Sequence, residues 1–184
     1  DRFDLEPGDR IWVDPGTYEE ADAIRIWMKD SGTSNSPVRV TGDTNRPFAG
    51  SVFKRTSRTV GAYGFELIQS DGLAFDSFMV SNTFSGFQID SGGNVALERV
   101  RAGYCVSNAV YASGNTRLTL ARSILEQSLL NGVQANTGAV VVVVGNLMRG
   151  NGMANVHVRG GNVDVYNGIL EADGSQRYVY YLGN

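Results

Sequence analysis

The fold of this chain is decided by residues 110–158, which read VYASGNTRLTLARSILEQSLLNGVQANTGAVVVVVGNLMRGNGMANVHV. Within this stretch Val110, Val133 and Val156 lie 23 residues apart, and each opens a short segment in which apolar and polar side chains alternate. Phe87 precedes these segments and Val179 follows them at the same spacing. Alternation of this kind is typical of half-buried strands, and a fixed period indicates a repeat architecture.

Two further segments recur in the same rhythm. One begins at Val95, Leu118, Val141 and, one residue early, Val163, and another begins at Ile124, Leu147 and Ile169. Leu73 continues the first of these upstream, at a step of 22 residues. Three short strands in about 23 residues match one coil of a parallel β-helix, whose coils stack about 4.8 Å apart. We therefore predict an all-β, right-handed parallel β-helix, a solenoid with 22–23 residues per coil.

Composition agrees with a folded domain and excludes several classes of protein. The 184 residues are 42% hydrophobic and 19% charged, which predicts one domain with its own core. A net charge of −3 without long basic runs argues against a nucleic-acid partner. The longest apolar run, 139–144, has six residues, so no membrane insertion is predicted. The single Cys105 leaves the redox compartment open.

The chain divides into two parts by the regularity of its pattern. Residues 1–64 predict irregular N-terminal coils with strands at 10–13, 23–28 and 37–41, and residues 65–184 predict regular coils. Residues 42–64 show no clear alternation and are interpreted as a loop on the flank. We expect residues 1–184 to form a single β-helix domain that is a fragment of a longer chain, because neither end shows a terminating element.

The opening of the chain carries a resemblance to a known family. Leu5-Glu6-Pro7-Gly8-Asp9-Arg10-Ile11-Trp12-Val13-Asp14-Pro15-Gly16-Thr17-Tyr18 is followed by Gly32-Thr33-Ser34-Asn35-Ser36-Pro37-Val38-Arg39-Val40. This stretch resembles the start of secreted polysaccharide-processing β-helices of the pectate-lyase-like superfamily, and is most similar to the family of alginate lyases and chondroitinase B. The resemblance implies an extracellular or cell-surface protein of bacterial or archaeal origin.

The alternation assigns a face to each strand residue. The residues predicted to point into the core are Phe87, Ile89, Val95, Leu97, Val110, Ala112, Leu118, Leu120, Val133, Ala135, Val141, Val143, Val156, Val158, Val163 and Val165. Between them, Gln88, Tyr111, Gln134, His157 and Tyr180 form an outward column, beside a second column of Asp90, Ser113, Asn136 and Arg159. Amides and aromatic rings with polar tips suit amphipathic ligands such as sugars.

We therefore predict a ligand-binding face made of Gln88, Tyr111, Gln134, His157, Tyr180 and Arg159. The alternative is that the column is an ordinary solvent-facing strand surface. Asn108, Asn131 and, one step late, Asn155 precede the same strands, and we expect them to hydrogen-bond along the solenoid axis as a stabilising ladder.

Charged residues also stack at a step of 23. Glu126 and Arg149 predict an ion pair between coils, whereas Arg99 and Arg122 stack like charges that need Glu98, Glu126 or a ligand anion to neutralise them. On the next strand face, Val140, Val142 and Val144 are expected to point outward. Such a patch predicts cover by protein, either from this chain, from a missing domain or from a partner. A further partner is predicted at the open edge of the C-terminal coil.

Two functions remain open. The first is a structural or polysaccharide-binding module without catalysis, and the second is a polysaccharide lyase or glycoside hydrolase that acts on an acidic polysaccharide. In the family that the opening resembles, a lysine and an arginine move the proton while asparagine and glutamate hold calcium, but this chain has no lysine beyond Lys54. If it is an enzyme, the predicted catalytic residues are His157, Arg99 and Arg122, with Glu98 as a candidate metal ligand. One histidine permits no histidine-based metal cluster, so no metal site or cofactor is predicted, and calcium is left open.

Overall fold

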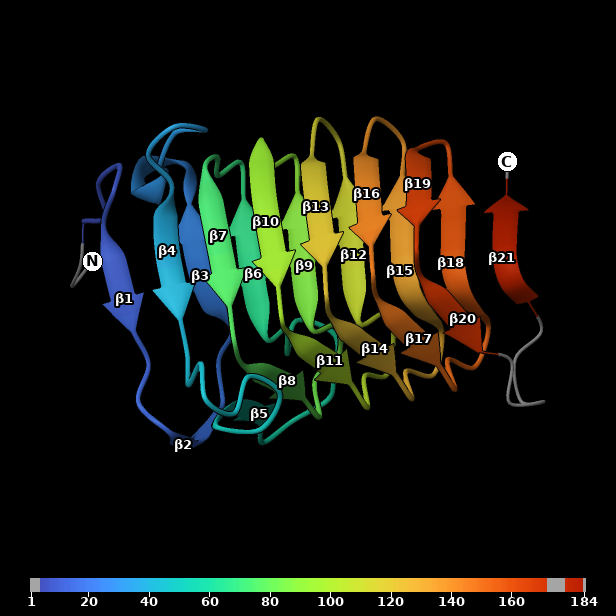
Figure 1. Ribbon diagram of the computed structural model, residues 1–184, viewed down its shortest axis with the longest axis horizontal. Coiled ribbons are helices and arrows are strands. Elements are labelled where there is room, and N and C mark those ends of the chain that lie inside the picture. Colours follow the sequence, from blue (N-terminus) through green and yellow to red (C-terminus); the bar gives the residue numbers. More distant parts are fainter. Residues whose placement is uncertain (1–3, 172–177, 184) are drawn as a thin grey trace.

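Short strands joined by tight corners follow one another along nearly the whole chain. The computed structural model describes residues 4–171 and the backbone of residues 178–183. Each strand pairs in parallel with the strand three places later in the chain, so that three seven-stranded sheets run side by side along the described part (Figure 1). The prediction of an all-β parallel β-helix is therefore confirmed.

The three sheets are named A, B and C in the order in which the chain visits them. Sheet A contains β1 (Arg10–Trp12), β4 (Val38–Thr41), β7 (Leu73–Asp76), β10 (Asn94–Glu98), β13 (Arg117–Ala121), β16 (Val140–Val144) and β19 (Asn162–Tyr166). Sheet B contains β2 (Gly16–Glu20), β5 (Ser51–Arg55), β8 (Met79–Ser81), β11 (Arg101–Gly103), β14 (Ile124–Glu126), β17 (Leu147–Arg149) and β20 (Ile169–Glu171). Sheet C contains β3 (Ile24–Trp27), β6 (Phe65–Ile68), β9 (Phe87–Asp90), β12 (Val110–Ser113), β15 (Asn131–Asn136), β18 (Ala154–Arg159) and β21 (Tyr178–Gly183).

The register of the regular coils follows the sequence period. Val133 pairs with Val110 on one side and with Val156 on the other. Val141 pairs with Val163, which confirms that this strand begins one residue earlier than the period of 23 would place it. Because the side-chain period of a strand is two, this register sends the same set of residues inward in every coil.

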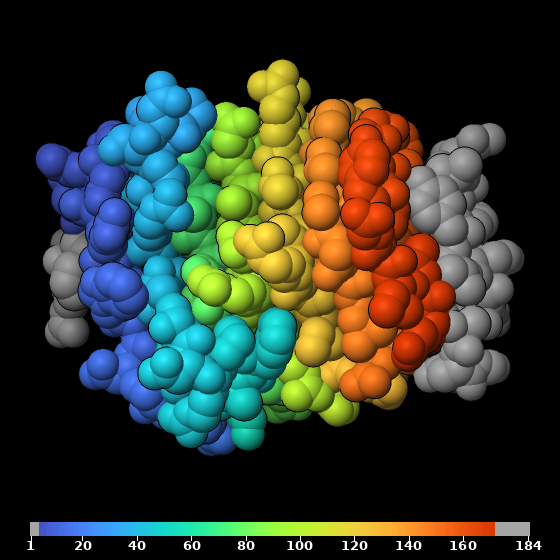
Figure 2. Space-filling view, viewed as in Figure 1, coloured from blue at the N-terminus to red at the C-terminus, as the bar shows by residue number. Residues whose placement is uncertain are grey.

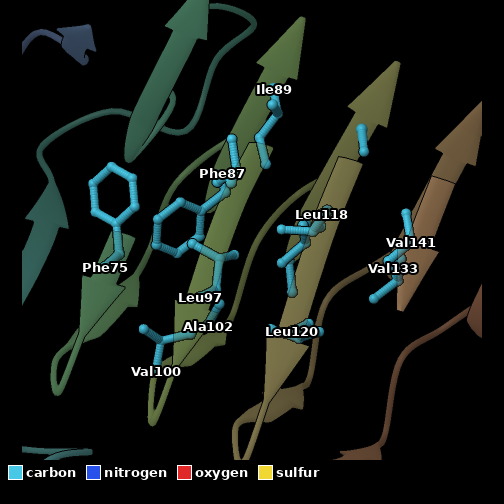
Figure 3. Close-up of a cluster of buried hydrophobic side chains, with 14 of the residues drawn as sticks. Phe75, Phe87, Ile89, Leu97, Val100, Ala102, Leu118, Leu120, Val133 and Val141 are labelled. Atoms are coloured by element: carbon cyan, nitrogen blue, oxygen red, sulfur yellow. The ribbon is translucent and has the colours of Figure 1, made fainter. Parts of the chain in front are cut away.

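The core lies between the sheets and is filled by the residues that the alternation places inside. All the predicted inward residues are buried except Val165, which is half-buried. Phe65, Phe75, Phe78 and Phe87 form an aromatic cluster in the early coils, with Phe65 stacked on Phe87 at 5.3 Å between ring centroids. Leucine and valine replace the rings in later coils (Figure 3). Each such side chain contributes about 1.5–3 kcal/mol through burial.

The corners between sheets A and B depend on one residue in the left-handed conformation. This residue follows the sheet A strand in successive coils, and the series consists of Ser77, Arg99, Arg122, Gly145 and Asn167, with φ between 48° and 63°. The residue after it turns inward. Where that residue is polar, its side chain accepts a hydrogen bond from a backbone amide of the preceding coil. The Ser123 hydroxyl accepts from the Val100 amide at 3.1 Å, and the Asn146 Oδ1 accepts from the Ser123 amide at 2.7 Å.

The N-terminal part contains strands that the sequence pattern did not predict. The segment 42–64, which the sequence predicts to be a loop, includes β5, which pairs with β2 and β8 in sheet B. The interpretation was wrong because β5 buries two polar residues, Ser51 and Arg55, beside Phe53. Arg55 is satisfied by the carbonyl oxygens of Tyr63 and Gly64. A short 3-10 helix, η1 (Met28–Asp30), follows β3.

Among the described residues, an apolar cavity lies at the N-terminal end of the solenoid core. This cavity of about 510 Å³ is lined by apolar residues that include Ile11, Val13, Ile26 and Phe53. Trp12 and Trp27 on the first coil are 66% and 46% exposed. Within the described residues no helix is long and apolar enough to cross a membrane.

Candidate functional site

The outer face of sheet C carries the polar column predicted from the sequence. Gln88, Tyr111, Gln134 and His157 occupy equivalent positions on β9, β12, β15 and β18. The first three side chains are half-buried, and His157 is 8% exposed. Because adjacent strands are about 4.8 Å apart, the column is a straight row of hydrogen-bonding groups along the solenoid axis.

Tyr180 does not belong to this column. The backbone of β21 pairs Tyr180 with Val156 and places Tyr181 opposite His157. The prediction assumed a step of 23 residues, but the chain takes 24 between β18 and β21, so every position shifts by one. A shift of one residue exchanges the two faces of a strand.

A second column lies beside the first and is joined to it by hydrogen bonds. Gln88 Nε2 donates to Asp90 Oδ2 at 3.1 Å, and the Ser113 hydroxyl donates to Asp90 Oδ1 at 2.9 Å. One coil further, Gln134 Nε2 donates to Asn136 Oδ1 at 2.9 Å, and Asn136 Nδ2 donates to the Tyr111 hydroxyl oxygen at 2.8 Å. These bonds fix the orientation of the polar groups before any ligand binds.

The asparagine ladder supports the same strands from inside. Asn131 Nδ2 donates to Asn108 Oδ1 at 2.8 Å, as predicted, and lies 3.2 Å from Gln134 Oε1 and 3.5 Å from His157 Nδ1. Asn155 does not continue the ladder, because Ala154 takes the position opposite Asn131. Asn155 instead accepts from Asn151 and donates to the Glu171 carbonyl oxygen.

His157 is enclosed rather than a surface histidine. Burial is the main cause that lowers its pKa, and the positive charge of Arg159 on the same strand lowers it further. The imidazole is therefore neutral at pH 7, with Nδ1 turned toward the Asn131 amide. A neutral imidazole can accept or donate a hydrogen bond, or accept a proton.

The other two predicted catalytic residues lie elsewhere on the solenoid. Arg99 and Arg122 occupy the left-handed corner position between sheets A and B, whereas His157 lies on sheet C. Arg99 Nε donates to Asp76 Oδ1 at 2.9 Å, and Arg122 forms an ion pair with Glu98. The structure thus joins each arginine to an acid of the preceding coil and does not bring the two arginines to His157.

Glu126 lies in a cluster of ion pairs, of which the sequence predicts only one. Glu126 forms the predicted ion pair with Arg149, at 2.9 Å, and a second pair with Arg101. Its side chain is only 2% exposed, and the two guanidinium groups compensate its buried charge. Arg101 was missed because its spacing from Glu126 is 25 residues instead of 23. Among the described residues, no three histidine, cysteine, aspartate or glutamate side chains gather in a way that would hold a metal ion.

The outer face of sheet A is different in shape and chemistry. A depression of about 500 Å³ runs across β4, β7, β10, β13 and β16, and its floor includes Ala74, Ala96 and Thr119. Figure 2 shows this face, with the loop that precedes β4 rising in light blue at its rim. Val140 is 39% exposed, whereas Val142 and Val144 are half-buried. The protein partner predicted over these valines stays a prediction.

Comparison with known proteins identifies the fold. No family model and no curated protein matches the chain. Among solved structures, pectate lyase Pel9A is 14% identical and superposes with a TM-score of 0.61 over 97% of this chain and 68% of that one. The chain has the pectate-lyase-like parallel β-helix fold.

A second solved structure supports the same fold. ORF18 of Geobacillus virus E2 is also 14% identical, with a TM-score of 0.64 over 86% of this chain. The chain spans 33% of the length of that phage protein. Identities this low establish the fold and do not carry the neighbours' activities to this chain. The closer resemblance to alginate lyases and chondroitinase B stays a prediction.

Proposed function

We propose that this chain is a polysaccharide-binding β-helix module of an extracellular or cell-surface protein from a bacterium or archaeon. One observation carries the proposal: Gln88, Tyr111 and Gln134 form a straight row on sheet C that hydrogen bonds hold in place. A fixed row of amides and an aromatic ring matches a linear chain of hydroxyl groups and sugar faces. The β-helix scaffold supplies the length that a polymer needs.

Some groups in the row still have a hydrogen-bond donor or acceptor to offer to a ligand. Gln88 donates through Nε2 to Asp90, which leaves its Oε1 as an acceptor that faces outward from β9. The Tyr111 hydroxyl accepts from Asn136 and can donate to a sugar oxygen. Arg159, at the far end of the second column, is exposed and offers a cation to acidic sugars.

Affinity electrophoresis through gels that contain alginate, pectate, chondroitin or a neutral glycan tests the proposal. In the gel that contains the neutral glycan, Tyr111→Ala is expected to reduce retardation about tenfold, while Tyr166→Ala, an exposed tyrosine on sheet A, serves as the matched control and leaves it unchanged. Circular dichroism checks that both variants fold. Equal retardation of the wild type and Tyr111→Ala in every gel would remove sheet C as the binding face.

The second candidate is a polysaccharide lyase, and the enclosed neutral His157 favours it as the base that removes a proton. The similarity in fold to a protein named as a pectate lyase supports this candidate. Unsaturated products that form with the wild type and disappear in His157→Gln would establish the lyase. Retardation without product supports the binding module.

A further inference from the structure

Two sets of arginines in this protein differ in whether a carboxylate of the chain pairs with them. Those at positions 99, 101, 122 and 149 each form an ion pair with a carboxylate of a neighbouring coil. Arg10, Arg39 and Arg117 make no side-chain hydrogen bond or ion pair within residues 4–171. All three extend from sheet A and are exposed to solvent.

These three arginines lie around the depression on sheet A. Arg39 and Arg117 belong to its lining, and Arg10 is the direct neighbour of Arg39 in the register of β1 and β4. From β4 to β13 there are three strand steps, so Arg39 and Arg117 are separated by about 14 Å along the solenoid axis. The positive charges therefore lie three strands apart along one groove, which continues past Arg117 to β16.

Several of the acids near this face are engaged by other partners. Asp76 and Glu98 hold Arg99 and Arg122. Asp71 Oδ1 accepts from the amides of Asn94 and Gly72 and from the Asn94 side chain, which lowers the pKa of Asp71, and Arg117 lies close enough to help lower this pKa but forms no ion pair with Asp71. Arginines that stand directly opposite each other repel, and an anion from outside the chain would relieve this repulsion at Arg10 and Arg39.

We propose that this groove binds a carboxylate-bearing polysaccharide, laid along the solenoid axis, with its carboxylates on Arg39 and Arg117. Guanidinium groups bind carboxylates through paired hydrogen bonds. The floor of Ala74, Ala96 and Thr119 has small side chains and is partly apolar, which suits the carbon faces of sugar rings. The groove lining contains no aromatic residue on which bases could stack, and the net charge is −3, so a nucleic acid fits less well.

This binding surface is separate from the one on sheet C and does not rest on it. The row on sheet C consists of amides, a tyrosine and a histidine, whereas the groove on sheet A is lined by Arg39 and Arg117, which form no ion pair within residues 4–171. The apolar side chains of Val140 and Val142 line the groove beyond Arg117, where we expect them to contact the ligand. The competing occupant of this face is a second copy of the chain.

Isothermal titration with a galacturonate hexasaccharide and with cellohexaose, at low and high NaCl, tests the proposal. Arg39→Gln and Arg117→Gln are each expected to weaken binding of the acidic probe about tenfold, the double variant more, and added salt should weaken it as well. Arg122→Gln is the matched control, because this exposed arginine already has Glu98 as a partner. Binding of cellohexaose should not change in any arginine variant.

Three results would overturn the proposal: unchanged affinity of the double variant, an equal loss in Arg122→Gln, or sedimentation that shows a dimer dissociated by Val142→Thr. Thermal melting confirms that the variants fold. Tyr111→Ala separates the two surfaces, because it should leave the arginine-dependent affinity for the acidic probe intact. If that affinity depends on Tyr111 alone, the groove on sheet A fails while the face on sheet C stands.

Discussion

The regular coils and the N-terminal coils satisfy their polar groups in different ways. In the regular coils a side chain finds its partner one coil away, as in the bonds between Arg99 and Asp76 and between Arg149 and Glu126, each 23 residues apart. In the N-terminal coils inserted loops lengthen the step, which reaches 41 residues between Arg25 and Glu66. Some polar groups there use partners close in sequence, such as Arg46 for Asp43.

This difference teaches what the repeat contributes. When every coil has the same number of residues, equivalent residues of neighbouring coils lie about 4.8 Å apart. Side-chain pairs between coils then recur at a fixed spacing and can be predicted from the sequence. Where the step varies, a buried group such as Arg55 depends on the carbonyl oxygens of a nearby loop. Stability should therefore be concentrated in the regular coils, and substitutions in the two regions should differ in cost.

The largest difference is expected between core positions. Leu97 is fully buried in the regular coils, whereas Ile11 on the first coil is 37% exposed. Leu97→Asp places a carboxylate in the core and should cost at least about 4 kcal/mol or prevent folding. Ile11→Asp should cost less than about 1 kcal/mol. Urea unfolding followed by circular dichroism measures both, and equal costs would contradict the proposed difference between the regions.

The next difference concerns charge. Glu126→Gln leaves Arg101 and Arg149 without a carboxylate at a site only 2% exposed, and should cost about 3 kcal/mol. Glu66→Gln breaks a pair with Arg25, whose side chain is 48% exposed, and should cost about 0.2–1 kcal/mol. The same unfolding experiment compares them, and the account fails here if Glu66→Gln proves the more costly change.

A smaller effect is expected at the corners. Asn146→Ala removes the acceptor of the Ser123 amide and the donor to the Leu120 carbonyl oxygen, both buried, and should cost about 2 kcal/mol. Asn115, which is exposed in the loop between β12 and β13, is the control. Asn115→Ala should leave the free energy of unfolding within about 0.5 kcal/mol of the wild type, and a cost for Asn146→Ala within the same margin would show that the corner bond is dispensable.

The smallest expected effect depends on pH. The pKa of His157 is lower in the folded protein than its usual value, so below about pH 6.5 the unfolded chain binds a proton that the folded chain does not. Stability should therefore fall as the pH drops from 6.5 toward 5, before the carboxylates titrate. Since His157 is the only histidine, unfolding of His157→Gln should lose this slope, and an unchanged slope would place the effect elsewhere.

The sequence predicts the repeat well because burial and spacing act together. Sixteen inward positions follow from alternation, and only Val165 is less than buried. The prediction fails where polar residues lie inside, as at Ser51 and Arg55 in β5, because alternation cannot distinguish a satisfied buried polar group from a surface one. It also fails at β21, where the step grows by one residue.

The sequence predicts which residues form the candidate site, but not their hydrogen bonds or their burial. The spacing predicts the row of Gln88, Tyr111, Gln134 and His157, yet not that His157 is enclosed or that Asn136 bonds to Tyr111. The three arginines around the groove on sheet A were missed, since Arg10, Arg39 and Arg117 do not recur at the step of 23 residues. Only the folded sheet shows which cations lack a carboxylate.

The central claim, that this solenoid binds polysaccharide, is tested most directly with the unmodified chain. Its mobility is measured in gels that contain pectate, alginate, chondroitin or a neutral glycan, with unsaturated and reducing-end products measured in parallel. The account predicts retardation in at least one acidic gel, without product. Unchanged mobility in every gel would contradict it.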